Sequence, residues 1–106
     1  MAREPYALVY SPDVDAHLDA IQRKYHSLIR ETIEEQLLFE PSHPTRNRKK
    51  LRTPAAFAAE WEIRFGPANR FRVLYGIEEE CHTVNVLAIG EKLHGRLLVG
   101  GKEIDL

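Results

Sequence analysis

The chain has 106 residues, and this length gives room for one compact domain, residues 1–106, but not for two. Hydrophobic residues make up 43% of the chain and charged residues 29%, a balance that excludes a disordered protein. The formal net charge of −1 hides a local excess, because the segment Arg46–Arg52 carries five positive charges and no acidic residue. Local charge is therefore a better guide to binding partners than the total.

Cysteine and histidine usage indicates a protein of a reducing compartment without a metal. Cys81 is the single cysteine of the chain, so neither an internal disulfide nor a cysteine-based zinc cluster is expected. The five histidines lack the spacing typical of metal ligands, and we predict no metal and no cofactor. The apolar run Tyr6–Tyr10 is far too short for a signal peptide or a membrane span. We therefore expect a cytoplasmic protein with no membrane association.

The first elements expected are a strand and a pair of helices. The β-favouring run Tyr6–Tyr10 predicts a strand, and Ser11 can cap the helix that follows it through its hydroxyl. Apolar residues then recur at helical spacing in two stripes, with a break near His26-Ser27. The stripes are Val14, Leu18, Ile21 and Tyr25, and then Leu28, Ile29, Ile33 and Leu37. They predict a helical hairpin, or one kinked helix, that ends by about Glu40 because two prolines follow.

The second half of the chain predicts strands. Thr45–Ala59 has no clean periodicity and is expected to be an exposed connection with a short turn at its end. Trp61–Phe65 and Arg70–Ile77 alternate apolar and polar residues around a turn, which is typical of a hairpin. In this hairpin we expect Arg64, Arg70, Arg72 and Leu74 to point outward, and the aromatic residues to belong to the core.

Two further segments complete the predicted sheet. Thr83–Ile89 is nearly continuously apolar, which suits a central strand. Leu97–Val99 and Lys102–Ile104 flank Gly100-Gly101 and predict a small terminal hairpin. The sequence therefore predicts an α+β fold, in which an N-terminal strand and a helical hairpin pack on a four-stranded antiparallel sheet, with a small C-terminal hairpin.

An ordered set of motifs resembles the RelE/ParE toxin superfamily. The motifs are Lys49-Lys50-Leu51, Trp61-Glu-Ile-Arg-Phe-Gly66, Arg70-Phe-Arg-Val-Leu-Tyr75 and Val86-Leu-Ala-Ile-Gly90. The resemblance extends from about Tyr6 to Lys92. It implies a RelE-like fold and a toxin of a bacterial type II toxin–antitoxin system. It also implies a cognate antitoxin that silences the toxin, and a higher-order toxin–antitoxin complex.

The resemblance implies two alternative activities. RelE-like members cleave messenger RNA on the ribosome without a metal and so block translation, whereas ParE-like members act on DNA gyrase. For the endoribonuclease, the resemblance carries three cations onto this chain, namely Arg64, Arg72 and Lys92. Two positions depart from the pattern, since Glu62 stands where a lysine is expected and Leu98 where a tyrosine is often found. A gyrase-directed toxin, a binding-only member with a degenerate site, and a structural adaptor of the same fold therefore stay open.

The residue types fit metal-free RNA cleavage, which needs a base, an acid and cations for the charge that gathers on phosphorus. The planar fork of arginine binds two phosphate oxygens, and two neighbouring strands are expected to bring Arg64 and Arg72 to one phosphate. His94 is our candidate for proton transfer, because it is close to Lys92 and histidine titrates near neutrality. The plain alternatives are an idle surface histidine and a solvated strand face with arginine–glutamate pairs.

The basic segment predicts an RNA-binding surface. Side chains that neutralise phosphates supply a salt-sensitive, sequence-independent part of RNA affinity. The residues predicted to do so are Arg46, Arg48, Lys49, Lys50, Arg52 and Arg70. The plain alternative for the same residues is a solvated loop.

Overall fold

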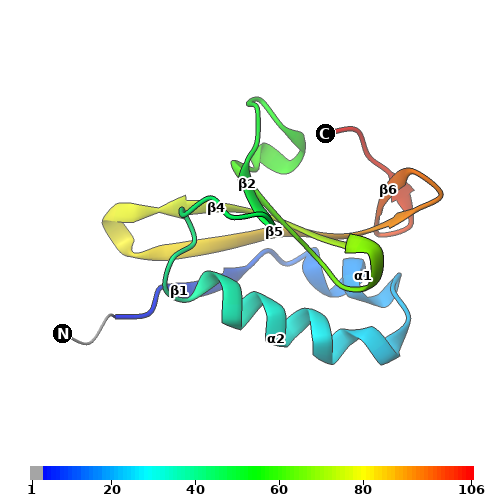
Figure 1. Ribbon diagram of the computed structural model, residues 1–106, viewed down its shortest axis with the longest axis horizontal. Coiled ribbons are helices and arrows are strands. Elements are labelled where there is room, and N and C mark those ends of the chain that lie inside the picture. The colour runs from blue at the N-terminus through cyan, green and yellow to red at the C-terminus, as the bar shows by residue number, and fades with distance from the viewer. Residues whose placement is uncertain (1–3) are drawn as a thin grey trace.

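The computed structural model describes residues 4–106, in which two helices cover one face of a seven-stranded sheet (Figure 1). The helices are α1 (Val14–Asp19) and α2 (His26–Leu37). The strands are β1 (Ala7–Tyr10), β2 (Arg48–Lys50), β3 (Trp61–Phe65), β4 (Phe71–Glu78), β5 (Thr83–Leu93), β6 (Arg96–Val99) and β7 (Lys102–Glu103). Short 3-10 turns lie at Arg23–Tyr25, Ala56–Ala58, Pro67–Asn69 and Glu79–Cys81.

The sheet follows the chain from β2 to β7, with every neighbouring pair antiparallel. The predicted central strand is confirmed, because β5 pairs with β4 along one edge and with both β1 and β6 along the other. The terminal hairpin is also confirmed, with Gly100 and Gly101 both at positive φ, as a tight turn requires.

Three features of the sheet differ from the sequence prediction. The sheet has seven strands rather than four, and it is not purely antiparallel, because β1 runs parallel to the first half of β5. The third feature is β2, which lies in the segment predicted to be an exposed connection. Its sequence Arg-Lys-Lys has no apolar alternation, so its pairing with β3 comes from the backbone and leaves no mark in the hydrophobic pattern.

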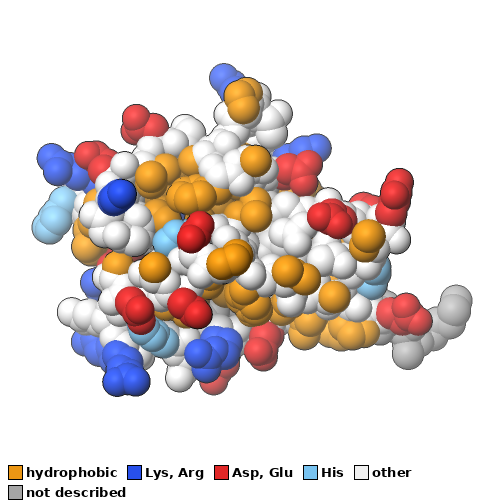
Figure 2. Space-filling model, turned by 180° about the vertical axis from the view of Figure 1, so that it is seen from behind, with side chains coloured by type: hydrophobic (Ala, Val, Ile, Leu, Met, Phe, Trp, Pro, Cys, Tyr) orange, Lys and Arg blue, Asp and Glu red, His pale blue; other side chains and the backbone are white. Residues whose placement is uncertain are grey.

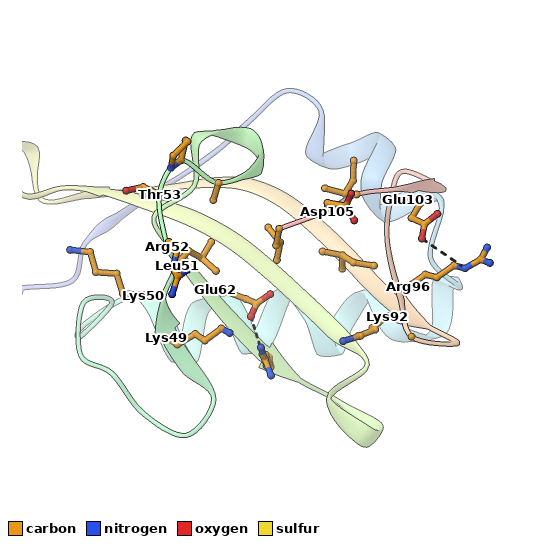
Figure 3. Close-up of a pocket in the computed structure, with 17 residues that line it drawn as sticks. Lys49, Lys50, Leu51, Arg52, Thr53, Glu62, Lys92, Arg96, Glu103 and Asp105 are labelled. Atoms are coloured by element: carbon orange, nitrogen blue, oxygen red, sulfur yellow. Dashed lines mark hydrogen bonds and ion pairs between the residues drawn. The ribbon is translucent and has the colours of Figure 1, made fainter.

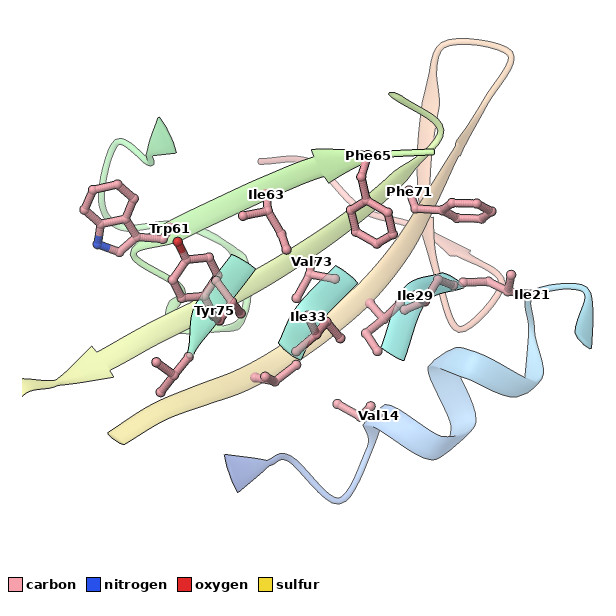
Figure 4. Packing of buried hydrophobic residues seen from close by; sticks show 14 residues of the cluster. Val14, Ile21, Ile29, Ile33, Trp61, Ile63, Phe65, Phe71, Val73 and Tyr75 are labelled. Atoms are coloured by element: carbon pink, nitrogen blue, oxygen red, sulfur yellow. The ribbon is translucent and has the colours of Figure 1, made fainter. Parts of the chain in front are cut away.

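The main core lies between α2 and the sheet. Ile29, Ile33 and Leu37 are spaced four residues apart, so they form one stripe of α2, and all three are buried. They pack against the inward side chains of β3 and β4, which the predicted alternation placed correctly (Figure 4). The first helix is shorter than predicted, because α1 ends at Asp19 and α2 begins at His26 after a 3-10 turn.

A second, smaller core covers the opposite face of the sheet. Leu74 points to this side, as predicted, but it is buried rather than exposed. It packs with Ala59, Ala88, Leu97 and Val99, which come from the segment before β3, from β5 and from β6. Figure 1 shows the segment after β2 and the C-terminal segment on this side of the sheet. The sheet therefore has hydrophobic cover on both faces.

Tyr75 joins β4 to the loop that follows α2. Its ring is fully buried, and its hydroxyl donates a 2.6 Å hydrogen bond to the Pro41 carbonyl. Burial raises the pKa of the Tyr75 hydroxyl, so the group stays a neutral donor. Tyr75→Phe keeps the ring and leaves the carbonyl unpaired, so we expect the free energy of unfolding to fall by about 1–2 kcal/mol. Urea unfolding followed by the fluorescence of Trp61 measures this, and an unchanged midpoint would contradict it.

His17 packs against the edge of β5, in the gap between the part of β5 that pairs with β1 and the part that pairs with β6. The imidazole is buried, and its Nδ1 lies 3.3 Å from the backbone N–H of Ile89, which donates to it. The ring also meets Phe57 edge to face, with 5.8 Å between centroids. Burial lowers the pKa of His17, and the nearby Asp13 carboxylate opposes this shift. The neutral ring is therefore the form that fits, because Nδ1 must accept a hydrogen bond.

The stability of the fold should fall in mild acid because of His17. In the unfolded chain His17 takes up a proton near pH 6.5, whereas the folded form binds it only at lower pH. Stability is therefore retained above about pH 6.5 and lost as the pH falls toward the lower folded pKa. We expect His17→Gln to lose less stability than the wild type between about pH 7.5 and about pH 5.5. Equal losses in urea unfolding of the two proteins would refute this role.

Candidate functional site

A groove of about 580 Å³ lies on the side of the sheet opposite the helices (Figure 3). It is bounded by β2 and the segment after it, by β3, by the turn between β5 and β6, and by the C-terminal segment. Its cations are Lys49, Lys50, Arg52, Arg64, Lys92 and Arg96. Its acids are Glu62, Glu103 and Asp105. Six cations against three acids give the groove a positive balance that suits an anionic ligand.

Glu62 and Arg64 of the groove lining belong to an arginine–glutamate–arginine cluster that also includes Arg72. Arg64 on β3 and Arg72 on β4 are direct cross-strand partners, as the sequence predicts for two neighbouring strands. Arg64 donates from Nε to Glu62 Oε1 at 2.9 Å, and Arg72 Nη1 lies 3.7 Å from Glu62 Oε2. The side chain of Arg64 is 36% exposed, that of Arg72 is 9% exposed and that of Glu62 is fully buried. Arg64 therefore forms the groove surface, and Arg72 lies beneath it.

Arg72 is fixed at both ends of its guanidinium. Its Nε donates to the Asn69 carbonyl at 3.1 Å, and its Nη1 faces Glu62. Burial lowers the pKa of the Arg72 guanidinium, the Glu62 carboxylate raises it, and the charge of Arg64 lowers it again. An arginine stays ionised throughout the physiological range, so two positive charges face each other across the strands with one carboxylate between them.

The structure separates the other two predicted catalytic residues. Lys92, near the end of β5, is exposed and lines the groove, and Figure 3 shows Lys49 and Lys92 on either side of Glu62. His94 lies two residues further on in the β5–β6 turn, exposed and with a positive φ of 52°. Its neighbour Gly95 lines the groove, but His94 does not. Arg64 and Lys92 thus line the same groove, Arg72 is the cross-strand partner of Arg64, and His94 lies next to the lining residue Gly95.

The structure places the predicted RNA-binding residues in different environments. Lys49, Lys50 and Arg52 line the groove, and Arg46 is exposed outside it. Arg70 is half-buried, pairs with Glu91, and stacks over the Tyr25 ring at 5.1 Å. The positive charge of Arg70 is therefore partly neutralised by Glu91.

Arg48 is buried, against the prediction of an exposed connection. Its terminal nitrogens donate to the carbonyls of Gln36, Glu40 and His43 at 2.6–2.9 Å, and to the Gln36 side-chain oxygen at 2.9 Å. The guanidinium is not available to a phosphate in this conformation. Because β2 presents alternate residues to opposite faces, Arg48 points to the helix layer whereas Lys49 points to the groove.

Among residues 4–106, no three side chains of His, Cys, Asp or Glu are grouped so that they could hold a metal ion. Over the same range, no helix is both long enough and apolar enough to cross a membrane.

Comparison with known proteins defines the class of protein to which this fold belongs. The fold of this chain is similar to that of a chain in the crystal structure of the toxin–antitoxin complex RelBE2 from Mycobacterium tuberculosis, with a TM-score of 0.68 and 24% sequence identity. The match covers 86% of this chain and 95% of that chain, and it shows a shared α+β fold. No curated protein sequence matches the chain.

The family itself is shown by a sequence model. Residues 8–93 match the model of the ParE toxin of the type II toxin–antitoxin system parDE, so the chain belongs to this toxin family. The resemblance to the RelE/ParE superfamily found in the sequence is thereby confirmed.

Proposed function

We propose that this toxin is an endoribonuclease that cleaves messenger RNA on the ribosome without a metal. The observation that supports the proposal most strongly is that Arg64 and Lys92 line one groove, while Arg72 stands directly opposite Arg64 on the neighbouring strand. Arg64 uses only Nε for Glu62, so its two terminal nitrogens are left for the oxygens of one phosphate. Lys92 adds a second positive charge from the neighbouring wall of the groove.

The proposed step needs only the RNA, the protein and solvent water. The 2′-oxygen attacks the adjacent phosphorus, the bond from phosphorus to the 5′-oxygen breaks, and the products carry a 2′,3′-cyclic phosphate and a 5′-hydroxyl. The proton of the 2′-hydroxyl passes to solvent water, and the 5′-oxygen receives a proton from a donor of the protein. Arg64 and Lys92 stabilise the charge that gathers on the phosphate oxygens. His94 is the proposed proton donor, because it is exposed in the β5–β6 turn and its neighbour Gly95 lines the groove.

A gyrase-directed toxin is the second candidate. Two observations favour it, namely the match of residues 8–93 to the ParE toxin family and the position of His94 outside the groove wall. In this case the same cationic groove would bind an acidic surface of a protein or DNA rather than a scissile phosphate.

One experiment separates the two candidates. The purified toxin is added to a reconstituted translation reaction with a defined messenger, and separately to gyrase with relaxed plasmid. The proposal expects messenger fragments with 5′-hydroxyl ends that depend on the ribosome, and unchanged supercoiling. Intact messenger together with a loss of supercoiling would reject the endoribonuclease activity and support a toxin that acts on gyrase.

The basic wall of the groove should govern the salt dependence of RNA binding. Replacing Lys49, Lys50 and Arg52 by alanine removes three charges from residues that line the groove. For single-stranded RNA, the slope of log affinity against log salt should become shallower by about 2. Fluorescence anisotropy with a labelled oligoribonucleotide over a salt series measures the slope. Arg46→Ala, outside the groove, is the single-charge control, and an unchanged slope in the triple variant would exclude RNA contact at this wall.

A cognate antitoxin is the proposed partner. The structural relative is a toxin–antitoxin complex, and the chain exposes several large hydrophobic side chains that a partner could cover. Figure 2 shows hydrophobic side chains gathered near the middle of the back of the molecule, with charged side chains around the margin. A smaller groove between β1, α1 and α2 is lined by Tyr10, Val14, Leu18, Ile29 and Ile33. Its apolar character suits a helix of a partner protein.

A further inference from the structure

Glu62 is an ionisable residue in an unusual position. It lies in the middle of β3, is fully buried, and has Lys49 and Leu74 as its cross-strand neighbours. Its Oε1 accepts from Arg64, whereas its Oε2 is buried and has no hydrogen-bond partner among the described residues. A buried carboxylate oxygen without a hydrogen bond is costly, so the position calls for a physical explanation.

Stability alone gives a poor explanation for this carboxylate. A buried ion pair is often no more stabilising than apolar residues of similar size, and the second core with Leu74 lies directly beside it. The direct pairing of Arg64 with Arg72 is also unfavourable, because like charges opposite each other on a sheet repel. The carboxylate between them offsets this repulsion, so that the two guanidinium groups can lie close together.

The geometry of the cluster fixes the direction of each guanidinium. Arg64 is held through Nε by Glu62, and Arg72 is held through Nε by the Asn69 carbonyl. Binding through Nε leaves the terminal nitrogens on the opposite edge of the planar fork. For Arg64, which lines the groove, these nitrogens remain as donors for a ligand.

We propose that Glu62 is a positioning residue whose buried carboxylate orients Arg64 toward a substrate phosphate and balances the charge of Arg72 beneath it. The inference rests on the proposed endoribonuclease function for the identity of the ligand. It goes beyond that function by giving a role to the residue at which this chain departs from the lysine expected of the superfamily. Because the carboxylate is enclosed, its effect on RNA passes through Arg64 rather than through direct proton transfer.

The activity test compares Glu62→Gln with the wild type in single-turnover cleavage of ribosome-bound messenger. The amide keeps the size of the side chain and removes its charge, so kcat should fall about 100-fold through misplacement of Arg64. Affinity for an oligoribonucleotide with a 2′-deoxy group at the cleavage position should stay equal or become tighter, because a negative charge has left the groove. The matched control is Glu80→Gln, which makes the same substitution at an exposed carboxylate in the turn between β4 and β5.

Three outcomes of this comparison would overturn the positioning role. The first is an unchanged kcat in Glu62→Gln. The second is the loss of one limb of the pH–rate profile, which would make Glu62 the proton acceptor. The third is additive losses in Glu62→Gln and Arg64→Ala, because a residue that acts through Arg64 adds nothing once Arg64 is removed.

A spectroscopic test separates this inference from the proposed function. The Nε–H resonance of Arg64, assigned by its absence in Arg64→Lys, should be protected from solvent exchange in the wild type and lose that protection in Glu62→Gln and Glu62→Leu. This measurement needs no RNA. If the Glu62 variants lose this protection but the wild type cleaves no RNA, the role of Glu62 in orienting Arg64 is retained and the endoribonuclease function is rejected. Unchanged protection in folded variants would reject the positioning role.

Discussion

Arg48→Ala is expected to lower the free energy of unfolding by about 3–4 kcal/mol, a large part of the about 5–15 kcal/mol that a domain of this kind has. The buried guanidinium donates to three backbone carbonyls and one side-chain oxygen around the end of α2. Alanine removes the shared donor of these acceptors and opens a cavity, and of the three carbonyls that of Glu40 keeps a second donor, the N–H of His43. The carbonyl of Gln36 is one of those that a helix C-terminus leaves unpaired, so α2 should fray from this end.

Urea unfolding followed by the fluorescence of Trp61 measures the effect of Arg48→Ala. Lys50→Ala lies two residues along the same strand with an exposed side chain, and should change stability by less than about 0.5 kcal/mol. Arg48→Lys keeps the charge and loses the fork, so its stability should lie between those of Arg48→Ala and the wild type. Equal midpoints for Arg48→Ala and Lys50→Ala would mean that the carbonyls find other partners.

Arg64→Ala is expected to reduce RNA cleavage about 10²–10³-fold. The loss is of the size found when one preorganised donor to a developing negative charge is removed. Arg64→Lys should recover only part of the rate, because an ammonium group cannot bind two phosphate oxygens in one plane. Rates of messenger cleavage in the reconstituted translation reaction measure both variants.

The control for Arg64→Ala must separate chemistry from folding. Removing Arg64 leaves Glu62 with Arg72 at 3.7 Å as its remaining ion-pair partner, so some loss of stability accompanies the loss of rate. Rates are therefore compared at a temperature where unfolding experiments show each variant folded. Arg23→Ala removes an exposed arginine of the 3-10 turn before α2, outside the groove, and should leave the cleavage rate unchanged. Cleavage by Arg64→Ala at the wild-type rate would show that the groove is not the site of RNA cleavage.

Local patterns in the sequence determined much of the architecture. The four-residue steps of Ile29, Ile33 and Leu37 defined the buried face of α2, and the two-residue alternation of Trp61–Phe65 and Phe71–Tyr75 defined the β3–β4 hairpin. That alternation also predicted that Arg64 and Arg72 share one face, because a hairpin with a short turn fixes which residues stand opposite each other. These features depend on neighbours in the chain, so a single sequence contains them.

The tertiary structure alone decided the environment of each charge. Arg48 and Lys49 are adjacent cations of one basic segment, yet one is buried under α2 and the other lines the groove, because β2 pairs with β3 in a register that the sequence pattern does not display. Glu62 likewise becomes a buried carboxylate only where β3, β4 and the second core meet. The parallel pairing of β1 with β5 also joins segments more than 70 residues apart. Burial and ion pairing depend on which distant segments come together, and local periodicity carries no information about that choice.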